Sequence, residues 1–134
     1  MNERAGLSIA IPVSPGELVD KITILEIKAE RIAEEAKLAS VRTELNLLRA
    51  ARDRAARPSA ELARLTADLK HANEALWEIE DRIRDCERSG DFGPRFIELA
   101  RAVYRTNDER AAIKRRINLL LGAAFLEEKS YRPY

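Results

Sequence analysis

The sequence predicts an all-α protein: an antiparallel three-helix bundle, or helical hairpin, with coiled-coil-like packing and a short extended N-terminal segment. First, apolar or small residues recur in steps of three and four along residues 62–86, so one stripe of a long helix faces a partner helix. Second, 35% of the residues are charged and 5% aromatic, a balance typical of long solvated helices. Third, 134 residues suit one domain, residues 1–134, with its own core.

An extended segment is expected before the first helix. Leu7, Ile9, Ile11 and Val13 alternate with smaller or polar residues, and Pro12 lacks a backbone donor, which favours an edge strand. This stretch is too short and too interrupted for a signal peptide. A strand needs a partner, and the sequence names none.

The first helix is predicted over residues 15–57. Ser14 is the expected N-cap and Glu17 completes a capping box. The apolar stripe changes its phase after Ile32, which predicts a bend near residues 34–37. No glycine or proline interrupts the pattern, so the sequence favours one long helix.

The second and third helices are predicted over residues 60–88 and 94–122. Pro58 ends the first helix, and the short turn after it predicts that the second helix packs antiparallel against the first. Gly90 ends the second helix. An irregular tail, residues 123–134, follows the third. The apolar stripe of the second helix is Leu62, Leu65, Leu69, Ala72, Leu76, Ile79, Ile83 and Cys86. The stripe of the third helix is Leu99, Val103, Thr106, Arg110, Ile113, Ile117, Leu120 and Ala124.

The composition argues against several functional classes. With 24 basic and 23 acidic residues, the net charge is +1, which demands neither nucleic acid nor a membrane surface. Basic residues gather in residues 42–57 and 94–122, but the helix between them is acidic, so charge matching between helices is favoured over nucleic-acid binding. The single cysteine, Cys86, fits a cytoplasmic protein. No cofactor and no metal site are expected, and His71 lacks ligands at metal spacing.

Four stretches, residues 11–28, 76–81, 99–108 and 127–131, resemble a bacterial all-helical family catalogued as a domain of unknown function. The resemblance covers nearly the whole chain. It implies a bacterial protein but no activity, cofactor or catalytic residue, so function has to be argued from the residues.

A polar stretch of the third helix is the candidate ligand-binding site. Arg101, Tyr104 and Asp108 share one face, and Asn107 falls on an inner stripe. Such a group of side chains can bind a small anion or a sugar hydroxyl. The competing interpretation is structural, because polar residues in a helical seam also set its register.

Acidic residues in the first turn of the first helix, Glu17 and Asp20, are a second candidate. Paired carboxylates can bind a metal or transfer protons. Capping and the helix dipole explain them equally well, and Lys21 follows Glu17 at the spacing of a surface ion pair. We therefore assign no catalytic residue.

Three apolar residues form the candidate interface. Ile24 and Ile27 widen the seam of the first helix, and Trp77 points away from the seam of the second, so all three need cover. The leading hypothesis is a non-enzymatic helical interaction or oligomerisation module. In it, a second copy of the chain (a homodimer) or another protein buries these three residues. The alternative is a small helical enzyme, or an anion- or sugar-binding protein, with its site on the third helix.

Overall fold

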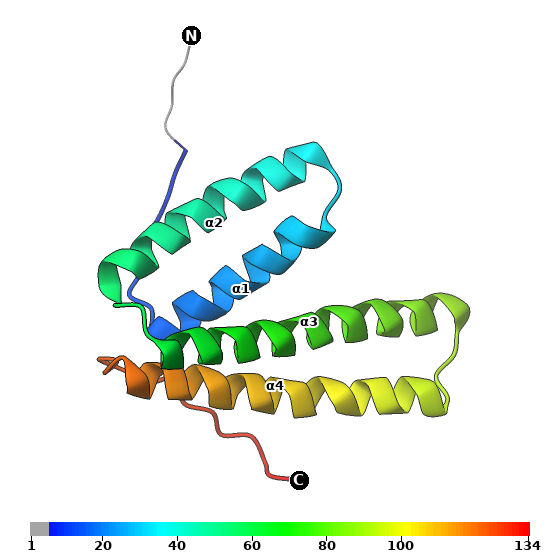
Figure 1. Ribbon diagram of the computed structural model, residues 1–134. Helices are drawn as coiled ribbons and strands as arrows, with labels where there is room; N and C mark the ends of the chain where they lie inside the picture. The colour runs from blue at the N-terminus through cyan, green and yellow to red at the C-terminus, as the bar shows by residue number, and fades with distance from the viewer. Residues whose placement is uncertain (1–5) are drawn as a thin grey trace.

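The computed structural model describes residues 6–134 and contains four helices joined by short connections (Figure 1). The helices are α1 (Pro15–Arg31), α2 (Glu35–Ala55), α3 (Ala60–Ser89) and α4 (Pro94–Leu120). No strand occurs in this part of the chain. The all-helical class is confirmed, whereas the three-helix bundle is wrong in its number of helices.

The predicted helix over residues 15–57 is two helices. The chain leaves the helical conformation at Ile32 (φ −81°, ψ 131°) and resumes it after Glu34 (φ −70°, ψ 122°). No glycine or proline causes this break. Its benefit is burial: α2 folds back along α1, and Leu45 packs against Ile22 and Leu25. A straight helix would leave these apolar stripes on separate, uncovered faces.

Helix α1 is the centre of the fold. It packs against α2 on one side and against α3 and α4 on the other, while α3 and α4 form a long antiparallel hairpin (Figure 1). Two apolar clusters fill these contacts. The cluster shared by α1, α3 and α4 comprises Val19, Leu62, Leu65, Leu69, Ala72, Ile113 and Ile117.

The turn at Pro58 does not produce the predicted hairpin. Helix α3 packs against α1 and α4, not against α2, which precedes it. The apolar stripe along residues 62–86 does lie on a continuous helix and is buried or half-buried throughout. The spacing of apolar residues therefore identified the buried face of α3 correctly. That face packs against α1 and α4, because α1 lies between α2 and α3.

The N-cap of α1 and the end of α3 are as predicted, but the Glu17 carboxylate pairs with Lys114 and does not complete a capping box. The Ser14 Oγ accepts a hydrogen bond from the Glu17 N–H at 3.2 Å, and the Ser59 Oγ accepts one from the Leu62 N–H at 3.0 Å. Gly90 ends α3 in the left-handed conformation, at φ 70°. These signals lie within one turn of the cap, which is why the sequence places these ends well.

The expected edge strand is wrong. Residues 6–14 are irregular, and Leu7, Ile9 and Ile11 are 91%, 75% and 70% exposed. The described chain offers no sheet edge, so an extended segment has nothing to pair with. We call residues 7–13 the N-terminal arm.

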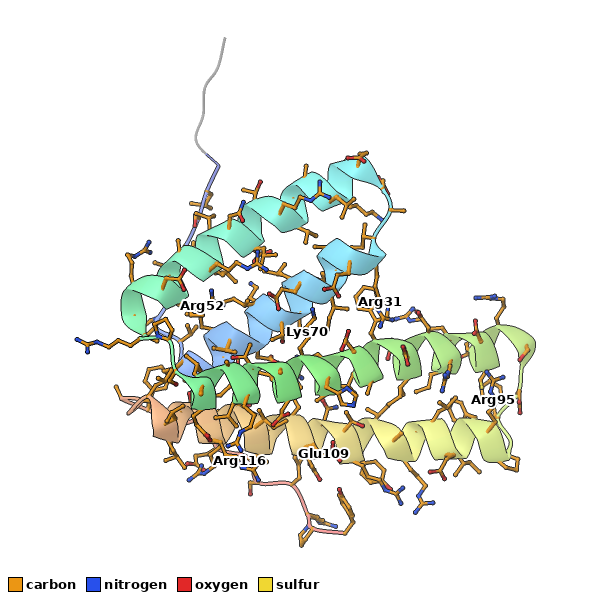
Figure 2. The ribbon with its side chains drawn as sticks, viewed as in Figure 1. Arg31, Arg52, Lys70, Arg95, Glu109 and Arg116 are labelled. Carbon is orange, nitrogen blue, oxygen red and sulfur yellow. The ribbon has the colours of Figure 1, made fainter. Side chains whose placement is uncertain are left out.

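Charged side chains line the outer faces and bridge neighbouring helices (Figure 2). Between α1 and α3, the Lys70 Nζ lies 2.6 Å from the Glu30 Oε2, and this hydrogen bond raises the pKa of Lys70. Between α1 and α2, the Lys21 Nζ lies 2.9 Å from the Glu44 Oε2. Lys21 therefore forms an ion pair with the neighbouring helix, whereas the sequence predicted a pair with Glu17 of its own helix. None of the described helices has both the length and the apolar character that a membrane crossing requires.

Gly16 lets α1 approach α4 closely. Its N–H donates to the Asn118 Oδ1 at 2.6 Å, and a Cβ at this position would lie 2.5 Å from the Lys114 carbonyl oxygen.

We expect Gly16→Ala to lower the free energy of unfolding by about 2 kcal/mol, because the two helices would be forced apart. Urea unfolding followed by circular dichroism measures this loss. Gly6→Ala is the control, because nothing lies within 4 Å of its Cβ position; equal midpoints for both variants would contradict the prediction.

Candidate functional site

Asp20 is a buried carboxylate at the junction of α1, α3 and α4. Its side chain is 1% exposed. The Arg110 guanidinium grips both carboxylate oxygens, with its Nε donating to Oδ1 at 2.9 Å and its Nη2 donating to Oδ2. Such a two-pronged pair fixes the orientation of both groups. The bond to Asp20 raises the pKa of Arg110, so the guanidinium stays charged.

Asn73 connects this ion pair to α3. Its Nδ2 donates to the Asp20 Oδ1 at 2.9 Å and to the Thr23 Oγ1 at 3.0 Å. The Thr23 hydroxyl in turn donates to the Asp20 carbonyl oxygen at 2.8 Å. Across the described chain, every fully buried side-chain nitrogen and oxygen has a partner. The network therefore satisfies a charge that would otherwise be costly to bury.

Lys114 extends the network toward the C-terminal tail. Its Nζ lies 2.7 Å from the Glu17 Oε2, 3.1 Å from the Glu127 Oε2 and 3.9 Å from the Asp20 Oδ2. Burial lowers the pKa of Lys114, but these carboxylates outweigh it and leave the pKa above its ordinary value. The same contact lowers the pKa of Glu127.

Helical spacing explains how these groups meet. On α4, Arg110, Lys114 and Asn118 are four residues apart, and on α1, Gly16 and Asp20 have the same spacing. Each set therefore lies on one face of its helix. The two faces meet because Gly16 has no side chain to hold them apart.

An open cleft of about 430 Å³ lies in front of this network, between α1, α3 and α4. Its walls are mainly apolar, with amides and charged groups at the floor and rim. The lining residues are Ile24, Ile27, Asn73, Leu76, Trp77, Glu80, Asp81, Val103, Asn107 and Arg110. All three predicted interface residues meet here: Ile27 is buried, and Ile24 and Trp77 are half-buried. Trp77 is thus covered on one side by its own chain and open on the other.

A second, larger hollow of about 920 Å³ lies between α4 and the C-terminal tail. We call it the tail groove. It is lined by Val103, Tyr104, Asn107, Asp108, Arg110, Ala111, Lys129, Tyr131, Arg132, Pro133 and Tyr134. Three of the four predicted ligand-binding residues are among them. The fourth, Arg101, is exposed outside the groove and lies 3.4 Å from Glu98 Oε2, so the structure does not bring it to the other three.

The tail is attached to α4 at both ends of the groove. The Tyr134 hydroxyl donates to the Asp108 Oδ2 at 2.7 Å, and the rings of Tyr134 and Tyr104 meet edge to face at 5.0 Å between centroids. At the other end, Glu127 accepts from Lys114 at 3.1 Å. The groove is therefore walled on one side by a non-helical segment that these contacts hold against α4.

Sequence reasoning missed Asp20 and Arg110 as partners. It explained Asp20 as a first-turn residue that favours the helix dipole, but Asp20 is the sixth residue of α1 and lies beyond its first turn. One signal was available: Arg110 interrupts the apolar stripe of its helix, and a charge in such a stripe needs a buried partner. The tail residues Tyr131, Arg132 and Tyr134 carried no comparable signal.

The arrangement offers binding chemistry: hydrogen-bond donors and acceptors, aromatic rings and fixed charges. Within residues 6–134, no group of three His, Cys, Asp or Glu side chains is placed to hold a metal ion. His71 is exposed and Cys86 is buried and free.

Residues 9–133 match the family described as "Family of unknown function (DUF6165)". The chain belongs to this family. The match covers nearly the whole chain and confirms the resemblance noted in its sequence. Comparison with curated proteins and with solved structures finds no match to either. Because the family description assigns no activity, function has to be argued from the cleft and the groove.

We expect Asp20→Asn to lower the free energy of unfolding by about 3 kcal/mol, because removing one member of a buried pair leaves the other charge uncompensated. Chemical denaturation measures the change. Asp68→Asn, at an exposed position of α3, is the matched control and should alter stability by less than about 0.5 kcal/mol. A stable Asp20→Asn variant would show that the pair does not hold α1 in place.

Acid should release the tail. Because the pKa of Glu127 is lowered in the folded protein, its bond to Lys114 is present above the ordinary value of 4.5 and is lost as the pH falls through the lowered pKa. In an NMR titration, the Glu127 carboxyl signal and the amide signals of residues 129–134 should shift together. Glu127→Gln should release this end of the tail from Lys114 at neutral pH, whereas Glu128→Gln, which removes only an exposed 3.5 Å ion pair with Arg115, should not. Titration of Glu127 at 4.5 would contradict the prediction.

Proposed function

We propose that this protein is a non-enzymatic helical interaction module that binds a second copy of itself through the cleft between α1, α3 and α4. The observation that carries the proposal is the convergence of Ile24, Ile27 and Trp77, from two helices, on one open apolar cleft. Large aromatic and aliphatic side chains at the centre of such a cleft are the usual anchors of a protein interface.

The lengths of the helices explain why this cleft is open. Helix α1 has 17 residues and α3 has 30, so at 1.5 Å per residue α3 is longer by about 20 Å. The far part of the α3–α4 hairpin therefore extends beyond α1 (Figure 1). Leu76 and Val103, the apolar residues of the hairpin that line the cleft, are only half-buried within their own chain.

The N-terminal arm is the segment of a second copy best suited to the cleft. Leu7, Ile9 and Ile11 alternate along an extended backbone, so their side chains can insert on one side of it. Burying each of them would contribute about 1.5–3 kcal/mol. In its own chain the arm leaves the N-terminal end of α1, away from the part of the helix that carries Ile24 and Ile27 (Figure 1). Reciprocal exchange of arms between two copies gives a closed, twofold arrangement.

Light scattering coupled to size-exclusion chromatography tests the proposal. We expect a particle of twice the 15.2 kDa chain mass, reduced to the single-chain mass by Trp77→Gln. The combined variant Leu7→Gln, Ile9→Gln and Ile11→Gln should have the same effect. Leu47→Gln, at an exposed apolar position of α2, is the control and should leave the dimer intact.

Dilution of the wild-type protein provides an independent measurement. Trp77 is the only tryptophan, so its fluorescence reports directly on cover of the cleft. Its emission should move to longer wavelength as the dimer dissociates. A wild-type particle that stays monomeric at high concentration would overturn the proposal. A dimer that survives the triple arm variant would overturn the role of the arm alone.

A further inference from the structure

The tail groove gathers all the tyrosines of the chain. The sequence contains three, and Tyr104, Tyr131 and Tyr134 all line this one hollow. Tyr131 and Tyr134 are 77% and 79% exposed, and Tyr104 is 41% exposed. Lys129 Nζ lies over the Tyr131 ring, 5.5 Å from its centroid, and Tyr134 packs edge to face with Tyr104. The ring surfaces that remain exposed provide stacking surfaces for a flat or ring-shaped ligand.

The charges that line the groove are mostly positive. Three cations line it, Arg110, Lys129 and Arg132, together with one carboxylate, Asp108. That carboxylate already accepts a hydrogen bond from the Tyr134 hydroxyl. Within the described chain, Arg132 makes no ion pair, and the nearest carboxylate oxygen of Lys129 is 3.8 Å away, on Glu127. The groove therefore has donors available for an anion.

Arg110 adds a donor whose position is set in advance. Its Nε and Nη2 are held by Asp20, while its Nη1 approaches the Asn107 Oδ1 at only 3.5 Å. A guanidinium that is already held by a carboxylate loses little conformational freedom when its remaining N–H groups bind a ligand. The amide of Asn107, which also lines the groove, supplies further polar groups beside it.

We propose that the tail groove binds a small organic anion in which a phosphate or carboxylate group is joined to a sugar or aromatic ring. The cations receive the acidic group and the tyrosines receive the ring. A volume of about 920 Å³ is within the range of sites for molecules of this size. The groove shares Val103, Asn107 and Arg110 with the apolar cleft, but its tyrosines and its two tail cations lie outside the cleft, so the proposal does not depend on the protein being a dimer.

The tail takes part in the site as one of its walls. Residues 129–134 supply two of the tyrosines and two of the cations, and the bond from Tyr134 to Asp108 holds them against α4. A bound anion would bridge the tail and α4. Ligand binding should therefore also strengthen the attachment of the tail.

Titration by NMR of the ¹⁵N-labelled full chain tests this site. The probes are glucose 1-phosphate, glucuronate and uridine monophosphate, with inorganic phosphate and glucose as controls. At least one ring-bearing anion should saturate and shift the amides of residues 103–111 and 129–134. Both controls should bind at least about tenfold more weakly, because each lacks one of the two recognised groups. The three probes distinguish a phosphate from a carboxylate and a sugar from an aromatic ring.

Variants assign the binding to the groove. Arg132→Gln and Tyr131→Ala, both at exposed positions, should weaken binding about tenfold without changing the melting temperature. Arg101→Gln is the control, because this exposed arginine lies on α4 outside the groove, and the variant should bind as the wild type does. Trp77→Gln should also leave binding unchanged, which separates this site from the dimer.

Three results would overturn the proposal. One is that none of the ring-bearing anions shifts the groove amides. Another is that inorganic phosphate or glucose binds as tightly as they do. The last is that Arg101→Gln weakens binding as much as Arg132→Gln.

Discussion

The ion pair between Asp20 and Arg110 constrains the rest of the structure. A carboxylate that is 1% exposed is tolerated only where its charge is matched and its oxygens are hydrogen-bonded. Arg110 and Asn73 meet that need from two different helices, which sets the register of α1 against both α3 and α4. Replacing such a pair with apolar residues often leaves the free energy of unfolding unchanged. The pair therefore contributes more to selecting one arrangement of the helices than to net stability.

Two binding surfaces follow from the position of Arg110. One side of its guanidinium is held by Asp20, and the other lines both the cleft and the tail groove, together with Val103 and Asn107. The surfaces differ in chemistry because different elements complete them. Helices α1 and α3 supply aliphatic groups and Trp77 to the cleft, whereas the tail supplies tyrosines and cations to the groove. We therefore propose a protein surface for the first and a polar small molecule for the second.

The candidate sites were predictable only in part. Ile24, Ile27 and Trp77 stood out because each lies off the seam of its own helix, and the structure places all three in one cleft. Tyr104 and Asp108, predicted to share a helix face, line one groove together with Asn107 of the inner stripe. Arg101 satisfied the same rule yet lies outside the groove, since helical spacing alone does not show where the tail crosses α4.

The sequence by itself determined the helical class, the capped ends of the helices and the buried face of residues 62–86. These features depend on hydrogen bonds and side-chain spacing within one or two turns, so the information lies close together in the chain. The phase change after Ile32 indicated a bend, but only the tertiary structure decided that the helix breaks and α2 folds back, because the gain there is the burial of Leu45 against α1. It also decided the pairing of Asp20 with Arg110, which are 90 residues apart. A charge in an apolar stripe shows that a partner is needed, but its identity depends on which helices pack together.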